Sequence, residues 1–142
     1  MPTQPTIRRL AMVCLPVLIL AALWLAPEAL ARLSANTIDT TATISDKGRH
    51  LVLTGPLTCD RVQWVDLRVT VTQRETGALA EGCVRFIGTP EQQIWTLEAQ
   101  TKGRNGFVAG PATAVALATS TLNGQTDDAH QWLVDIVLEE GE

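Results

Sequence analysis

The sequence predicts an all-β domain that follows an N-terminal leader, on three observations. Beyond residue 37, short segments alternate apolar and polar residues with a period of two, as half-buried strands do. Turn-forming residues separate these segments at regular intervals, and no segment beyond residue 32 has helical periodicity. The apolar run Leu10–Ala26, near the start, departs from this pattern.

The first 31 residues have the three parts of a secretory signal peptide. Arg8 and Arg9 precede the apolar run, and the small-x-small motif Ala-Leu-Ala at 29–31 follows it. We expect a signal helix over 1–31, cleavage near Arg32, and a secreted or extracytoplasmic protein in an oxidising compartment. The alternative is an uncleaved membrane anchor, because the run approaches the roughly 20 residues that span a bilayer. In that case this segment would make the chain's membrane contact.

The rest of the chain predicts a linker over 32–37 and one β-domain over 38–142. Each predicted strand has an apolar face, and the clearest is Val62–Gln73, where four apolar residues alternate with polar ones. Chain order gives Ile38–Ser45, His50–Thr54, Val62–Gln73, Ala78–Ile87, Gln92–Lys102, Ala112–Leu122 and His130–Glu139 as strands. The sixth is rich in Ala and Thr.

Turn signals define the ends of these strands. They lie at Asp46-Lys47-Gly48, Gly55-Pro56, Glu75-Thr76-Gly77, Gly88-Thr89-Pro90, Arg104-Asn105-Gly106 and Asn123-Gly124. Asn-Gly is a favoured two-residue hairpin turn, so it should join the last two strands.

Seven strands in two antiparallel sheets predict an immunoglobulin-like or fibronectin-III-like sandwich. Trp95 and Trp132 fall on inward faces, so we expect them in the core. Trp64 shares the outward face of Asp66 and Arg68.

Cys59 and Cys83 are a candidate disulfide, because two cysteines in an exported domain usually pair. A hairpin that turns at Glu75-Thr76 would place Cys83 opposite Arg68, with Cys59 about 30 Å further along the strand. A disulfide needs Cβ atoms about 4 Å apart, so this pairing requires a bend, another register or the absence of a direct hairpin. An intermolecular bridge through an outward Cys83 stays open as the rival.

Composition and motifs narrow the function classes. The formal net charge of −4 argues against nucleic acid, for which a basic surface is expected. The chain has no Gly-x-Ser-x-Gly elbow, phosphate-binding glycine loop or Cys-x-x-Cys motif, so we expect no catalytic residues, cofactor or metal. The alternative is a small secreted hydrolase or metal-binding protein that uses Asp127, Asp128 and His130. We interpret that loop as a solvated turn, because no second cluster supplies further ligands.

The segments Val69–Gln73, Thr76–Gly82 and Gln92–Trp95 carry a family resemblance. They resemble small exported bacterial Ig-like β-sandwich proteins of uncharacterised function, over roughly residues 38–139. Such proteins often carry a second Cys just before the Gln-x-Trp stretch, whereas here the Cys lies earlier, at Cys83. The resemblance implies the fold but no reaction and no catalytic residues.

These observations predict an exported, non-enzymatic binding or structural module with an unknown protein or surface ligand. Its contact surfaces would be sheet edges and loops, by strand addition or loop recognition. The loops Gly103–Pro111 and Asn123–Ala129 are the expected contacts, because they are long and polar.

Overall fold

The computed structural model describes residues 33–34 and 37–141. The predicted signal helix over 1–31 and the cleavage site near Arg32 lie outside these residues. Among the residues described, no helix is long and apolar enough to cross a membrane.

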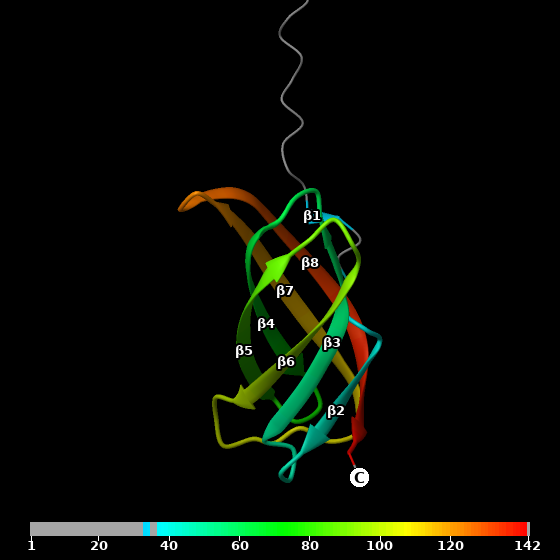
Figure 1. The fold of residues 1–142 in the computed structure, drawn as a ribbon. Helices are drawn as coiled ribbons and strands as arrows, with labels where there is room; N and C mark the ends of the chain where they lie inside the picture. The colour runs from blue at the N-terminus through cyan, green and yellow to red at the C-terminus, as the bar shows by residue number, and fades with distance from the viewer. Residues whose placement is uncertain (1–32, 35–36, 142) are drawn as a thin grey trace, which may run out of the picture.

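The described chain is almost entirely strand (Figure 1). The strands are β1 (Leu33–Ser34), β2 (Thr41–Ser45), β3 (His50–Cys59), β4 (Gln63–Gln73), β5 (Ala78–Gly88), β6 (Gln93–Thr101), β7 (Gly110–Leu122) and β8 (Gln125–Glu140). The predicted strands correspond to β2–β8. Leu33–Ser34, inside the predicted linker, pair with Cys59 and Thr58 as β1.

The strands β2–β8 close into a single barrel, so the prediction of a two-sheet sandwich is wrong. They follow the order β3-β2-β8-β7-β4-β5-β6, and β6 then pairs back onto β3. Figure 1 shows the strands tilted around a common axis, with the β7–β8 hairpin projecting outwards from the barrel wall at the upper left. β2 and β8 run parallel, whereas β3 and β6 are antiparallel, with residues 50–57 of β3 paired to residues 93–100 of β6. Alternating apolar and polar residues suit both architectures, and these two long-range pairings decide between them.

Several local predictions are confirmed. Arg68 lies opposite Cys83 in the β4–β5 hairpin, which is the register predicted from its turn. Asn123 and Gly124 have φ angles of 51° and 80° and join β7 to β8. Two positive φ values in succession are those of the favoured hairpin turn.

The largest local difference is in β3, which continues through Gly55-Pro56 instead of turning there. Gly55 lies opposite Trp95 of β6. A Cβ on Gly55 would lie 2.3 Å from the Thr37 carbonyl oxygen and 2.6 Å from the Trp95 ring, so the glycine makes room for both. This glycine therefore serves close packing inside a strand.

The barrel interior is apolar. β7 contributes alanine at successive inward positions, whereas facing strands contribute larger side chains, and this mixture fills a small barrel. The inward alanines are Ala112, Ala114, Ala116 and Ala118. Trp95 is buried as predicted, Trp132 is half-buried against the core, and Trp64 is exposed on the outside.

Candidate functional site

The loop predicted as the alternative metal or hydrolase site makes structural contacts. The Asp128 carboxylate accepts hydrogen bonds from the backbone N–H of Leu33, at 3.0 Å, and of Ala129, at 2.9 Å. The His130 ring lies 5.5 Å from the Trp132 ring, centroid to centroid. Within the described residues, no group of three or more His, Cys, Asp or Glu could hold a metal ion. Asp128 therefore ties β1 to the start of β8, and Asp127 and His130 form no metal-ligand set with it.

The two cysteines of the candidate disulfide are separate free thiols in the structure. Cys59 is buried at the end of β3, and Cys83 is exposed on the outward face of β5. Burial raises the pKa of the Cys59 thiol, the neighbouring Gln63 side chain opposes this, and the Asp60 carboxylate adds to it. Burial lowers the reactivity of a thiol, and Cys59 is fully buried.

One chain of polar side chains was not predicted from the sequence. Ser45 and His50 face each other across the β2–β3 hairpin, and Ser45 Oγ lies 3.2 Å from His50 Nδ1. On the other side of the ring, His50 Nε2 lies 3.4 Å from Glu98 Oε2. Serine, histidine and a carboxylate in this order are the components of a hydrolytic triad. The turn Asp46–Gly48 is a signal for the Ser45–His50 pair, but Glu98 arrives through the long-range β3–β6 pairing.

The geometry of this chain differs from that of a hydrolytic triad. In a triad, serine contacts Nε2 and the acid contacts Nδ1, whereas here the two contacts are exchanged. The side chains of His50 and Glu98 are 26% and 72% exposed, so water competes for both contacts. Ser45 and His50 border a surface hollow of about 340 Å³, whose floor includes Gln100 and Thr101. The arrangement can relay a proton, but it does not exclude water.

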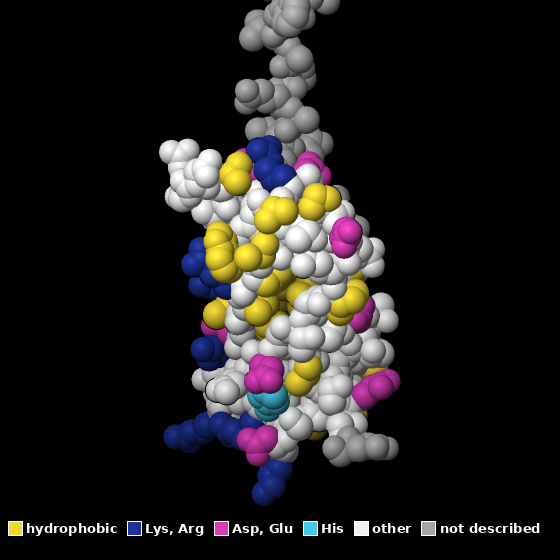
Figure 2. All heavy atoms as spheres, viewed as in Figure 1, with side chains coloured by type: hydrophobic (Ala, Val, Ile, Leu, Met, Phe, Trp, Pro, Cys, Tyr) yellow, Lys and Arg dark blue, Asp and Glu magenta, His cyan; other side chains and the backbone are white. Residues whose placement is uncertain are grey.

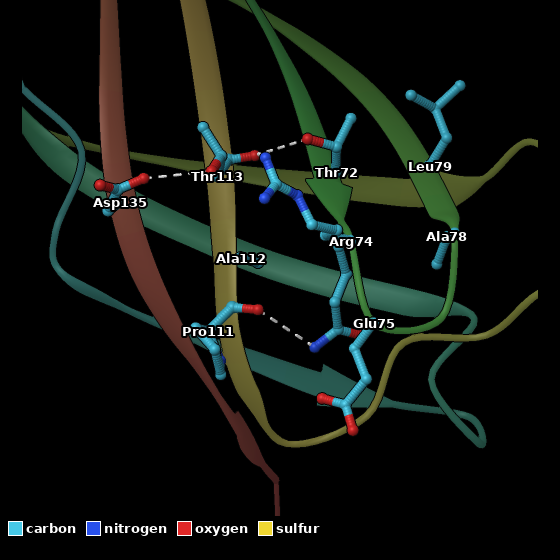
Figure 3. Close-up of a pocket in the computed structure, with 11 residues that line it drawn as sticks. Thr72, Arg74, Glu75, Ala78, Leu79, Pro111, Ala112, Thr113 and Asp135 are labelled. Atoms are coloured by element: carbon cyan, nitrogen blue, oxygen red, sulfur yellow. Dashed lines mark hydrogen bonds between the residues drawn. The ribbon is translucent and has the colours of Figure 1, made fainter.

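A hollow of about 890 Å³ lies on the outside of the barrel beside the β4–β5 turn (Figure 3). Thr72 donates to the Thr113 carbonyl at 3.5 Å, and the Thr113 hydroxyl donates to Asp135 Oδ1 at 3.1 Å. Arg74 and Glu75 from the turn line the same hollow. The hollow is open to solvent, and both positively and negatively charged side chains line it.

The loop Gly103–Pro111, predicted as a contact surface, is folded onto this end of the barrel. The buried Gln73 side chain donates to the Val108 carbonyl at 2.9 Å and accepts from the Val108 N–H at 3.0 Å. Asn105 donates to the Thr76 carbonyl at 2.9 Å, and Phe107 is buried. The loop therefore closes one end of the barrel. The second predicted loop, Asn123–Ala129, belongs largely to β8 and projects from the barrel with the β7–β8 hairpin (Figure 1).

Exposed apolar side chains gather around the end of the barrel that lies away from the loop Gly103–Pro111. We define the apolar rim as Val62, Trp64, Ile87 and Ile94, which are 62%, 47%, 46% and 63% exposed. Trp64 and Ile87 lie side by side on β4 and β5, and the Arg85 guanidinium lies 5.2 Å from the centroid of the Trp64 ring. Figure 2 shows hydrophobic side chains gathered in the upper half of the face formed over β5, β6 and β3.

Several local features shape this rim. Two residue pairs, Ala80–Thr101 and Glu81–Gln100, join β5 to β6 at the opposite end of the strands. Towards the rim, the inward side chains of Val84 and Phe86 stay half-buried, and they pack on the core. The rim therefore joins an apolar outer surface to core side chains that remain accessible.

Two comparisons with known proteins, by family model and by sequence, give no match. No protein-family model matches the chain, and no curated protein matches it in sequence. The resemblance to exported bacterial sandwich proteins stays an expectation, and the barrel replaces the fold that it implied.

Proposed function

We propose that this chain is an exported, non-enzymatic binding module that captures a protein partner through the apolar rim. The rim is the observation that carries the proposal. Single exposed apolar residues are ordinary on protein surfaces, whereas contiguous apolar patches mark interaction sites. Trp64, with Arg85 stacked on it, adds the two residue types most enriched at binding hot spots.

The chemistry of the rim defines the kind of partner. Val62, Ile87 and Ile94 favour an apolar segment, and the Trp64 ring can stack on an aromatic or aliphatic side chain. The Arg85 Nε atom also lies 3.4 Å from Asp66 Oδ1, and the side chain remains exposed. The guanidinium can therefore donate hydrogen bonds to an acidic group of the partner. An exported partner with an apolar segment next to an acidic residue fits these features. Export itself is supported by the leader-like residues at the start of the sequence.

The experiment is photo-crosslinking and affinity capture from the extracytoplasmic fraction of the producing cell. The double variant Val62→Ser/Ile94→Ser removes apolar surface from the rim without touching the buried core. The matched control is Leu133→Ser, because Leu133 is 65% exposed on β8, outside the rim. We expect the wild type and the control to capture the same partner and the double variant to lose it. Equal capture by all three proteins would refute binding at the rim.

A second candidate function is weak esterase activity at Ser45, His50 and Glu98, and their hydrogen-bonded chain is the observation that favours it. The assay is hydrolysis of p-nitrophenyl acetate by the purified protein, compared with Ser45→Ala and with the control Thr43→Ala. Thr43 is a second exposed hydroxyl residue on β2. A rate that disappears with Ser45→Ala and not with Thr43→Ala would support the candidate. A wild-type rate equal to that of Ser45→Ala would eliminate it.

A further inference from the structure

The outward face of β5 carries a self-complementary sequence of side chains. Leu79, Glu81, Cys83, Arg85 and Ile87 point outwards in that order and are all exposed. The order is apolar, acidic, thiol, basic, apolar. When this order is aligned with its own reverse, with Cys83 at the centre, each apolar residue lies opposite an apolar residue and each charged residue lies opposite one of the other sign.

A self-complementary stripe of this kind suits a symmetric dimer, whose two subunits are related by a two-fold axis. In a symmetric dimer, the same patch of both subunits meets itself, so residue i contacts residue j and j contacts i. If two β5 faces pack antiparallel with the axis at Cys83, Glu81 of each copy lies opposite Arg85 of the other. Leu79 of each copy then lies opposite Ile87 of the other, at the two ends of the contact.

The neighbouring charges on the same surface permit this contact. Arg85 lies 3.4 Å from Asp66, and Glu81 lies 3.7 Å from Lys102, and all four side chains are about half exposed. Exposed ion pairs of this kind contribute little, so each charge is free to interact with a second copy as well. Arg68 lies beside Cys83 on β4, near the axis, and is the one group there that would meet a like charge.

We propose that a second copy of this chain packs on the outward face of β5, antiparallel, with Cys83 at the two-fold axis. The stripe from Leu79 to Ile87 is about 26 Å long at the rise of a strand, which is small for a specific interface. The dimer is therefore weak and depends on concentration. Sheets that pack face to face lie about 10 Å apart, so the two thiols face each other at a spacing too wide for a direct disulfide.

The dimer proposal does not depend on the function of the apolar rim. Ile87 of the rim and Arg85, which stacks on Trp64, also belong to the β5 stripe. The double variant Val62→Ser/Ile94→Ser lies outside the stripe and should dimerise like the wild type. Loss of partner capture and loss of dimerisation can therefore be told apart.

The experiment combines sedimentation equilibrium with cross-linking by a short bis-maleimide, which reacts at Cys83 because Cys59 is buried. Cys83→Ala is the cross-linking control. Glu81→Arg and Arg85→Glu each place like charges opposite one another twice in the dimer, and each should weaken dimerisation about tenfold. The double variant Glu81→Arg/Arg85→Glu exchanges the two charges and should restore it. Arg68→Gln should strengthen it.

The charge exchange makes the proposal falsifiable. All variants alter exposed side chains, and circular dichroism will verify that each retains the β-fold. A wild type that stays monomeric at millimolar concentration would overturn the proposal. So would single variants that dimerise like the wild type, or a folded double variant that fails to recover. Glu81→Arg raises the net charge by two and Arg85→Glu lowers it by two, so a general effect of net charge would move dimerisation in opposite directions in the two single variants. Weakening by both single variants, followed by restoration in the double variant, is therefore an outcome that general changes in net charge or stability would not produce.

Discussion

Replacement of Gln73 by methionine should strongly destabilise the barrel. The Gln73 amide is buried and makes four hydrogen bonds, of 2.9 and 3.4 Å to the carbonyls of Val108 and Pro111, 3.0 Å to the Val108 N–H and 3.2 Å to the Thr76 hydroxyl. Methionine has a similar volume, so the change removes the hydrogen bonds without opening a large cavity. At about 1 kcal/mol for each of the three shorter bonds, the expected loss is about 3 kcal/mol.

The assay is urea unfolding followed by tryptophan fluorescence, since Trp95 lies in the core and reports barrel opening. In a separate thermal unfolding measurement, a loss of about 3 kcal/mol corresponds to a decrease in Tm of roughly 12–24 °C for a domain of this size. The control is Gln131→Met, an exposed glutamine on β8, which should change stability by less than about 0.5 kcal/mol. Hydrogen exchange should also become faster at the Val108 amide. If Gln73→Met matched its control, the side chain would not hold the loop closed.

Four further predictions concern the cysteines, a glycine and the leader. Gly88→Ala should cost about 1–3 kcal/mol in chemical denaturation, because its Cβ would lie 2.2 Å from Cys59 Sγ, and Cys59→Ala in the same chain should relieve part of the loss. Thiol titration of the chain from Arg32 onward, which lacks Cys14, should find one reactive group in the folded protein, Cys83, and two after unfolding; two blocked thiols would instead indicate a disulfide. The pKa of the Cys59 thiol is raised in the folded state, so the thiol's contribution to the free energy of unfolding is complete below the unfolded pKa and declines as pH rises above about 9. Cys59→Ala should flatten that decline of stability with pH. Mass spectrometry of the exported protein should give an N-terminus near Arg32, and an intact chain in a membrane fraction would contradict cleavage.

Local patterns in the sequence determined much of the wall of this barrel but not its closure. The alternation in β4 and the turn at Glu75–Gly77 were sufficient to predict that Arg68 lies opposite Cys83. Closure depends on β2 with β8 and on β3 with β6, and no turn residue specifies these distant pairs. The alanine-rich inward face of β7 was the available hint, because a small barrel needs small residues on part of its wall.

The candidate sites were likewise predictable only where they depend on the pattern of a single strand. Trp64 was predicted to face outwards from the alternation of its own strand, and it does. Ile94 becomes part of the apolar rim because the β5–β6 connection returns it beside the end of β3, where Ile94 pairs with Pro56. Glu98 reaches His50 by the same pairing. Residues that meet through long-range contacts are not visible as a motif in the linear sequence.

The parallel pairing of β2 with β8 has a consequence for the order of assembly. Thr41 near the start of the barrel pairs with Val137 near its end, so the wall stays open until the last strand has emerged. Distant pairings of this kind slow folding and expose strand edges in the meantime. Under the export that we propose, this order would suit a chain that crosses a membrane in extended form, since the barrel cannot close before the C-terminal strand arrives on the far side.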